Sequence, residues 1–145
     1  MVQVLSARLM AIADALPLRP GMRVLEIGCG TGALAREMAR RIGDGHVLGI
    51  DRSDKAIAMA RHLCAAEIEA GLLSLRQAEA ESFALEPREA PYHIAVAIRV
   101  GALDGRHPEA GKRAMRCIAT ALAPHGRLFI DGGDPLRAIS PAAEE

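Results

Sequence analysis

Short, almost entirely apolar segments alternate along this chain with longer segments of helical periodicity, and this alternation restricts the folds open to it. The apolar segments have the length of strands. They lack the alternation of polar and apolar residues that a strand with one solvent-exposed face shows, so both of their faces must be covered. Strands that are joined by helices and covered on both faces form parallel sheets. The sequence therefore predicts one α/β domain, doubly wound around a mainly parallel sheet of about five strands. The expected strands are 22–27, 46–50, 72–76, 94–100 and 127–130, and the expected helices are 2–16, 31–42, 51–70 and 110–122.

Prolines and glycines at 17–21 end the first helical segment. They separate an N-terminal helix at 1–20 from a domain at 21–133. The tail at 134–145 is rich in Pro, Ala and Glu, and we expect it to be loose. A chain of 145 residues matches the commonest size of a single domain.

Composition and charge argue against several classes of protein. Eighteen basic and eighteen acidic residues cancel, without a basic block, so a nucleic-acid partner is not expected. No apolar stretch approaches the roughly 20 residues of a membrane span. The three cysteines, Cys29, Cys64 and Cys117, are far apart and form no C-x-x-C pair, so neither a metal site nor a disulfide framework is expected. A reduced, cytoplasmic location is the default expectation.

A glycine loop follows the first expected strand, in VLEIGCGTG at 24–32. Gly28, Gly30 and Gly32 permit positive φ and leave backbone N–H groups open to a ligand. The helix that begins near Thr31 presents its positive end to the same place, which suits an anionic group. In a doubly wound sheet this edge is where ligands bind. A tight turn without a ligand is the alternative interpretation.

Two carboxylates accompany the loop. Glu26 lies within the buried strand, where a carboxylate needs a donor. Asp51 closes the second strand, about 20 residues beyond the loop, where an acid can accept both hydroxyls of a ribose or cap the next helix. The looser dinucleotide pattern G-x-G-x-x-G/A also fits, at Gly28, Gly30 and Ala33. A dinucleotide site has no obvious use for Glu26, whereas a ligand with an ammonium group does.

Four stretches in order, VLEIGCGTG, GIDRS, QAEAESF and LAPHGRLFIDGG, resemble the successive motifs of class I S-adenosylmethionine-dependent methyltransferases over residues 20–133. The resemblance implies that the loop lies beside the methionine portion of S-adenosylmethionine and that Glu26 supports this region. It implies that Asp51 binds the ribose and Glu79 the adenine amino group, and that S-adenosylhomocysteine is the product. The implied cofactor-binding residues are Glu26, Gly28, Cys29, Gly30, Gly32, Asp51, Arg52, Glu79, Ala80 and Arg99.

The sequence departs from the family pattern at three places. Glu79 stands where the family usually has Asp, and Ala78 where it has Gly. Tyr92 and His93 replace a Phe-Asp pair that often enters the fourth strand. The family sheet usually ends in a hairpin of two further strands, whereas only five strands are expected here. The fifth strand would then have an open edge, which proteins normally cover. We therefore expect a homodimer that pairs through this edge.

The acceptor side of the site is expected after the fourth strand, in RVGALDGRHPEAG. Positioning alone can supply about 7–11 kcal/mol of catalysis in well-oriented reactions, so a general base is optional. Asp104 or His107 could orient or deprotonate an acceptor, with Arg99 and Arg106 nearby. The alternative is a solvated loop followed by a helix start at Pro108.

Three functions stay open on the sequence. The first is methyl transfer to a small molecule, whose identity the sequence does not give. The second is a non-catalytic relative that serves as a partner subunit. The third is a dinucleotide-dependent oxidoreductase, which Glu26 and the glycine spacing disfavour.

Overall fold

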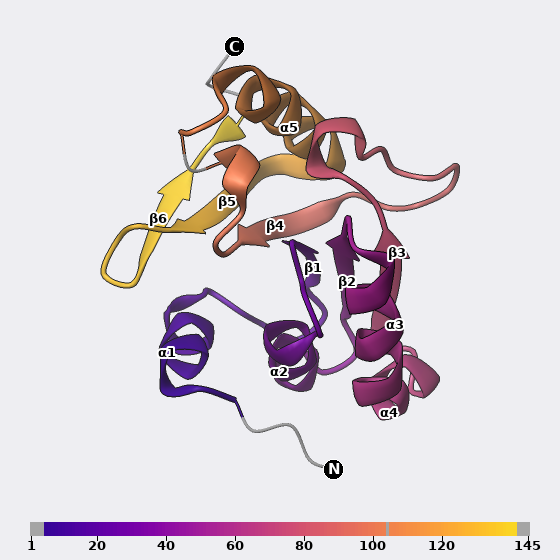
Figure 1. Cartoon of the computed structure of the whole chain (residues 1–145). Helices are drawn as coiled ribbons and strands as arrows, with labels where there is room; N and C mark the ends of the chain where they lie inside the picture. Colours follow the sequence, from indigo (N-terminus) through magenta and orange to yellow (C-terminus); the bar gives the residue numbers. More distant parts are fainter. Residues whose placement is uncertain (1–4, 104, 142–145) are drawn as a thin grey trace.

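The computed structural model describes residues 5–103 and 105–141, which form one six-stranded sheet with helices on both faces (Figure 1). The strand order is β3-β2-β1-β4-β5-β6. The first five strands are parallel, and β6 runs antiparallel to β5. The strands are β1 (Arg23–Ile27), β2 (His46–Asp51), β3 (Leu73–Gln77), β4 (Tyr92–Ala97), β5 (Leu122–Asp131) and β6 (Leu136–Ile139). The helices are α1 (Ala7–Ala15), α2 (Ala33–Arg41), α3 (Asp54–Leu63), α4 (Ala65–Glu69) and α5 (Pro108–Ala121), with 3₁₀ turns η1 (Ala80–Ser82) and η2 (Gly101–Leu103).

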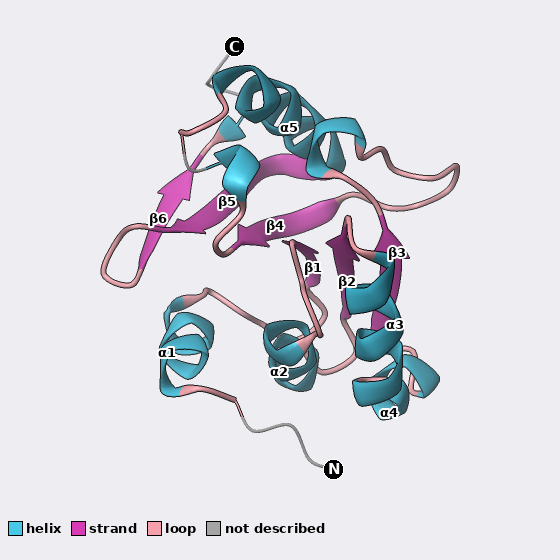
Figure 2. Cartoon of the chain, viewed as in Figure 1, coloured by secondary structure: helices cyan, strands magenta, loops and turns pink. Residues whose placement is uncertain are grey.

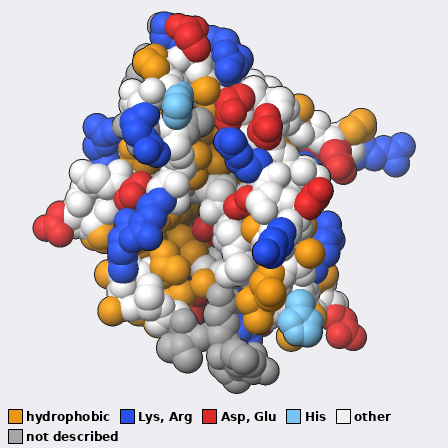
Figure 3. Space-filling model, in the orientation of Figure 1, with side chains coloured by type: hydrophobic (Ala, Val, Ile, Leu, Met, Phe, Trp, Pro, Cys, Tyr) orange, Lys and Arg blue, Asp and Glu red, His pale blue; other side chains and the backbone are white. Residues whose placement is uncertain are grey.

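The two faces of the sheet bury separate hydrophobic cores (Figure 2). Successive residues of β1 point to opposite faces. Val24 therefore packs in the core with Ile12 of α1 and Met38 of α2, whereas Leu25 packs with Ile118 of α5. This arrangement confirms the predicted doubly wound α/β fold. Figure 3 shows a hollow with a hydrophobic floor between α1 and the strands above it.

The single helix expected at 51–70 is two helices. Ser53 caps α3 by accepting a hydrogen bond from the backbone N–H of Ala56 at 3.1 Å. The break falls at Cys64, which is fully buried. Its thiol contacts the carbonyl oxygen of Gly32 at 3.7 Å, so the break coincides with a contact to the glycine loop. No local breaker residue precedes Cys64, which is why the pattern predicted a continuous helix.

The expectations for the fourth and fifth strands differ from the structure at their ends. The strand expected at 94–100 ends at Ala97, and the chain turns away through Arg99, whose φ is +58°. The strand expected at 127–130 begins at Leu122, and its pairing with β4 has an irregularity between Tyr92 and Ile94.

The expectation of a loose tail and an open fifth-strand edge is wrong over 136–139. These residues form β6, which pairs with Leu128–Asp131 of β5. The sheet therefore has six strands rather than about five, and the edge through which a homodimer was expected is occupied by the chain itself. A Cβ on Gly133 would lie 2.1 Å from the carbonyl oxygen of Leu136, so the hairpin requires glycine at this position. No helix in the described part of the chain is long and apolar enough to cross a membrane.

Candidate functional site

The glycine loop follows β1 at the carboxyl edge of the sheet. Gly28 and Gly32 have φ values of +70° and +88°, a region that favours glycine. A Cβ on Gly28 would lie 2.9 Å from Cγ2 of Val100, and a Cβ on Gly32 would lie 2.7 Å from Sγ of Cys64. Space and conformation therefore both require glycine at these two positions. The loop packs closely between the segment after β4 and the break after α3.

Asp51 ends β2 and holds the loop in place. Its Oδ2 accepts a hydrogen bond from the backbone N–H of Gly30 at 2.9 Å, and its Oδ1 accepts one from the N–H of Ser53 at 2.9 Å. Because Ser53 caps α3, Asp51 is not the cap of that helix. Each of its oxygens keeps a lone pair for a further donor. Asp51 also lines a cavity, so a ligand hydroxyl can reach it.

Glu26 is 4% exposed, and its Oε1 has no hydrogen-bond partner among the residues that the structure describes. Burial raises the pKa of this carboxyl well above its ordinary value, and the nearby charge of Asp51 raises it further, against a backbone hydrogen bond from Ala35. An unpaired buried carboxylate is costly. The position therefore suits a ligand with a positive or donating group beside the loop.

The cavity at this edge has a volume of about 210 Å³ and lies between the glycine loop, the ends of β2 and β3, and the turn after β4. A second cavity of about 490 Å³ lies at the ends of β4 and β5. Val100 lines both cavities, so they adjoin at its side chain. We call them the cofactor cavity and the acceptor cavity. The cofactor cavity is lined by Ile27, Gly28, Asp51, Arg52, Ala78, Glu79, Ala80, Glu81, Arg99, Val100 and Gly101.

Comparison with known proteins decides the family. The sequence pattern of the family described as "Methyltransferase domain" matches residues 24–126, which is most of the chain. This chain belongs to the methyltransferase domain family. The match includes the glycine loop, Asp51, Glu79 and β4, so the whole lining of the cofactor cavity lies within it. The acceptor cavity is only partly included, because Ile130, Asp131, Gly132 and Arg137 follow the matched residues.

Two relatives and one solved structure illustrate the similarity. The chain is 35% identical over 111 residues to a ubiquinone biosynthesis O-methyltransferase of Aeromonas salmonicida, covering 76% of this chain and 42% of the relative. It is 34% identical over 126 residues to a ubiquinone/menaquinone biosynthesis C-methyltransferase of Ectopseudomonas mendocina, covering 83% and 47%. A methyltransferase from Geobacter sulfurreducens in complex with S-adenosyl-L-homocysteine superimposes with a TM-score of 0.68 at 24% identity, covering 88% and 48%. The chain spans less than half the length of these relatives.

The structure places the sequence-predicted residues of the methyltransferase domain in two groups. Six of them line the cofactor cavity: Gly28, Asp51, Arg52, Glu79, Ala80 and Arg99. Four do not line it and belong to β1 or the glycine loop: Glu26, Cys29, Gly30 and Gly32. Burial, with the charges of Glu26 and Asp51, raises the pKa of the Cys29 thiol, so this residue is unsuited to be a thiolate nucleophile.

Of the residues expected on the acceptor side, Arg99 lines the cofactor cavity, whereas His107 and Arg106 line neither cavity. His107 is exposed at the start of α5 and lines neither cavity. Asp104 lies outside the described residues. Arg106 lines neither cavity either, although its Nη2 would be 3.5 Å from a Cβ on Gly101.

Sequence reasoning missed Val100, Asp131 and Arg137, all of which line the acceptor cavity. Asp131 ends β5 as Asp51 ends β2, and this shared position was an available signal. Its Oδ2 forms an ion pair with Nη2 of Arg8 at 3.2 Å, and its Oδ1 accepts a hydrogen bond from the backbone N–H of Arg99 at 3.2 Å. Arg137 belongs to β6, which the sequence pattern did not predict.

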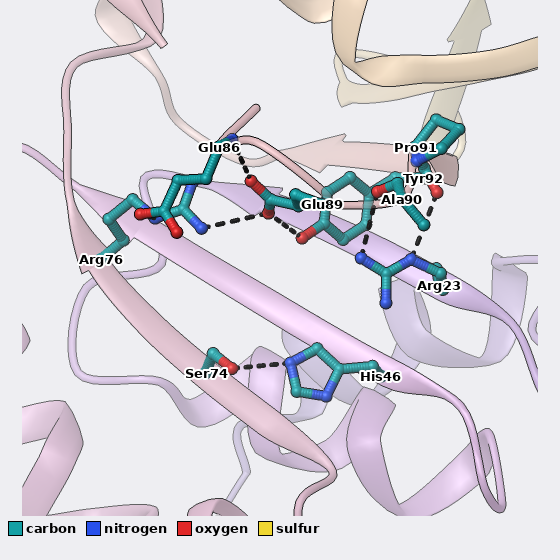
Figure 4. Close-up of polar contacts among 9 residues, drawn as sticks. All are labelled: Arg23, His46, Ser74, Arg76, Glu86, Glu89, Ala90, Pro91 and Tyr92. Carbon is teal, nitrogen blue, oxygen red and sulfur yellow. Dashed lines mark hydrogen bonds and ion pairs between the residues drawn. The ribbon is translucent and has the colours of Figure 1, made fainter. Parts of the chain in front are cut away.

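A polar cluster lies where the loop before β4 contacts the first residues of β1 and β4, and Arg76 reaches it from near the carboxyl end of β3 (Figure 4). Glu89 accepts hydrogen bonds from Nη2 of Arg76 at 3.1 Å, from the Tyr92 hydroxyl at 2.5 Å and from the Glu86 N–H at 2.7 Å. Burial pushes the pKa of Glu89 upward, but these hydrogen bonds together hold it below its ordinary value. We call these residues, with Arg23, His46 and Ser74, the amino-end cluster.

The remaining contacts of the amino-end cluster also hold the loop and the strands together. Arg23 donates to the carbonyl oxygens of Ala90 and Pro91 at 3.1 and 3.3 Å, and its guanidinium lies 4.6 Å from the centre of the Tyr92 ring. His46 joins β2 to β3 through Ser74 Oγ at 2.7 Å. The cluster borders a hollow of about 360 Å³, but its polar groups are directed at one another.

Proposed function

We propose that this chain catalyses S-adenosylmethionine-dependent methyl transfer to a small-molecule acceptor. The observation that carries the proposal is the pair of cavities that adjoin at Val100. One is lined by carboxylates and the glycine loop, and the other has Asp131 as the one carboxylate among its described lining residues. A donor in the first cavity would thus face an acceptor in the second. Family membership supports the proposal, as do relatives named as O- and C-methyltransferases.

The residues of the cofactor cavity suit the parts of S-adenosylmethionine. Asp51 would accept hydrogen bonds from the ribose hydroxyls through its free lone pairs. Glu79 would accept a hydrogen bond from the adenine amino group. The partnerless Oε1 of Glu26 fits the donor-rich aminoacyl end beside the glycine loop. When bound, this cofactor supplies a methyl group on a positively charged sulfur, and the surrounding carboxylates complement that charge.

The contribution of the chain to the reaction is mainly orientation. Among the described residues that line the acceptor cavity, the titratable side chains are Asp131 and Arg137. Asp131 is already engaged by Arg8 and by the Arg99 N–H. We therefore propose that the cavity aligns an acceptor whose nucleophile needs little deprotonation, so that positioning supplies most of the rate.

Titration calorimetry with S-adenosylmethionine, S-adenosylhomocysteine and NAD tests the cofactor. We expect micromolar binding of the two sulfur compounds and none of NAD. Asp51→Ala should lower the affinity for S-adenosylhomocysteine at least about 100-fold, because it removes a charged group that accepts hydrogen bonds from two ribose hydroxyls. Asp54→Ala is the matched control: Asp54 is exposed in the first turn of α3 and lines neither cavity, so its removal should leave affinity unchanged. Absence of binding by both sulfur compounds would overturn the proposal.

Turnover separates the enzyme from a non-catalytic relative. The non-catalytic alternative is favoured by the position of His107, which does not line the acceptor cavity. Release of S-adenosylhomocysteine in the presence of a panel of hydroxylated and aminated aromatic acceptors would establish catalysis. Tight cofactor binding with no release of S-adenosylhomocysteine in the presence of any acceptor would favour the partner-subunit alternative.

The setting of the protein completes the proposal. We propose a cytoplasmic location, which is supported by three free cysteines and the absence of a disulfide among the described residues. A small-molecule acceptor rather than a nucleic acid is supported by the balanced charge. A homodimer is also proposed, but not through the edge of β5, because β6 occupies that edge. Light scattering at high concentration tests whether the chain associates through another surface.

A further inference from the structure

The acceptor cavity combines an apolar floor with charged residues at its rim. Ala97, Val100, Leu103 and Ile130 supply the apolar lining. Its volume of about 490 Å³ lies within the range of pockets that enclose small organic molecules. The floor therefore suits a flat apolar body, such as an aromatic ring system, rather than a sugar or a peptide backbone.

The charge of Asp131 is compensated within the protein. Its two oxygens contact the Arg8 guanidinium and the Arg99 backbone N–H, each at 3.2 Å. A ligand in the cavity thus meets a carboxylate that already has an opposite charge beside it. Asp131 consequently gives the cavity little net negative potential.

Arg137 has no charged partner among the residues that the structure describes. Arg137 lines the cavity and forms no ion pair or side-chain hydrogen bond with any residue that the structure describes. It stands opposite Ile130 in the β5–β6 register, so the two side chains lie on the same face of the sheet. The guanidinium therefore stands beside the apolar floor, with donors free for a ligand.

Resting on the proposed methyl transfer, we propose that the acceptor is an aromatic or similarly flat carboxylic acid whose carboxylate pairs with Arg137 while its body covers the apolar floor. A guanidinium binds a carboxylate through two parallel hydrogen bonds. A carboxylate is favoured over a phosphate because its single charge matches the one guanidinium among the described residues that line this cavity, whereas a phosphate group carries about 1.5–2 charges at neutral pH.

The test compares acids with their neutral amides. The probes are 3,4-dihydroxybenzoate and 1-hydroxy-2-naphthoate, each with the corresponding amide, titrated into protein saturated with S-adenosylhomocysteine. For the wild type, at least one acid should bind about tenfold or more tightly than its amide, as expected for a charged hydrogen-bonded pair. Arg137→Gln should reduce this preference to less than about threefold, and Arg137→Lys should give an intermediate value because it keeps the charge and loses the fork.

The matched control is Arg113→Gln, which removes an exposed arginine of α5 that lines none of the cavities described here. It should retain the full preference, and all the variants should bind S-adenosylhomocysteine as the wild type does. Equal binding of acid and amide, no binding of either acid, or a preference that survives Arg137→Gln would overturn the inference. If the wild type does not bind S-adenosylhomocysteine, the proposed function fails, whereas the acid–amide comparison without that ligand still reports on the cavity.

Discussion

In the amino-end cluster Glu89 accepts hydrogen bonds from three donors, whereas the buried Glu26, towards the carboxyl end of β1, has an Oε1 without a hydrogen-bond partner among the described residues. The same contrast extends to the arginines. Arg23 and Arg76 are bound to backbone and carboxylate oxygens, while Arg137 has no partner among the described residues. One end uses its polar groups to hold a loop, and the other keeps them available. Changes at the amino end should therefore alter stability alone, and changes at the carboxyl end should alter ligand binding.

Gly32→Ala is expected to have the largest effect on stability. The substitution forces an L-residue into a φ of +88° and places a Cβ 2.7 Å from the buried sulfur of Cys64. Strain and overpacking together should lower the free energy of unfolding by about 2–4 kcal/mol, measured by urea denaturation. Gly30→Ala is the matched control, because Gly30 also has a positive φ but a Cβ there meets nothing within 4 Å. It should cost only about 1 kcal/mol, and an equal cost for both variants would contradict the packing argument.

Glu26→Gln should move stability and binding in opposite directions. The pKa of Glu26 is raised in the folded protein, so ionisation of this group destabilises the fold as the pH rises from about 4.3, its value in an unfolded chain, through the folded pKa. At pH 7 the variant should be more stable than the wild type by about 2 kcal/mol in the absence of ligand. Its affinity for S-adenosylhomocysteine should fall about tenfold, since the carboxylate no longer balances the aminoacyl end.

Denaturation from pH 4 to pH 8 and calorimetry check this pair of effects. The stability gain should grow with pH and vanish near pH 4. A variant that is less stable than the wild type at pH 7 would show that Glu26 is satisfied within the protein.

Glu89→Gln should lower stability without affecting the cofactor. The pKa of Glu89 is lowered in the folded protein, so its contribution is present above the unfolded pKa and is lost as the pH falls through the folded pKa. At pH 7 we expect a loss of about 1–2 kcal/mol and unchanged affinity for S-adenosylhomocysteine. The difference from the wild type should disappear in acid. Glu86→Gln serves as control, because its exposed side chain pairs with Arg76 at 3.6 Å and should contribute almost nothing.

Arg23→Lys should have the smallest effect. It removes the hydrogen bonds to Ala90 and Pro91 and the contact with the Tyr92 ring. We expect a loss of about 0.5–1 kcal/mol and faster amide hydrogen exchange in the loop at 84–91. A change in cofactor affinity would break the proposed separation between the two ends of the sheet.

The sequence pattern predicted the central part of the fold because β1, β2 and β4 are buried on both faces. Their composition therefore carries the signal without help from tertiary structure. The pattern failed at the periphery. The β6 segment has four residues, too few for a periodic signal, and it is formed through a hairpin that depends on Gly133. The break at Cys64 depends on a contact with the glycine loop.

The site divides in the same way. Asp51 and Gly28 could be predicted because each follows directly from the end of a buried strand. Val100 and Arg137 could not, since their roles depend on where the chain turns after β4 and on the pairing of β5 with β6. Asp131 lies between these cases. The strand at 127–130 was predicted, but the role of the residue that follows it was not.

The short strand β6 also affects how this protein behaves in concentrated solution. Without Leu136–Ile139, the last four residues of β5 would present unpaired N–H and C=O groups, the kind of edge on which other chains add and fibrils grow. The replacement edge is only four residues long and has the charged Arg137 within it, and both properties discourage the addition of a further strand. A segment of four residues thus protects this edge of the sheet, opposite the edge formed by β3, from self-association into aggregates.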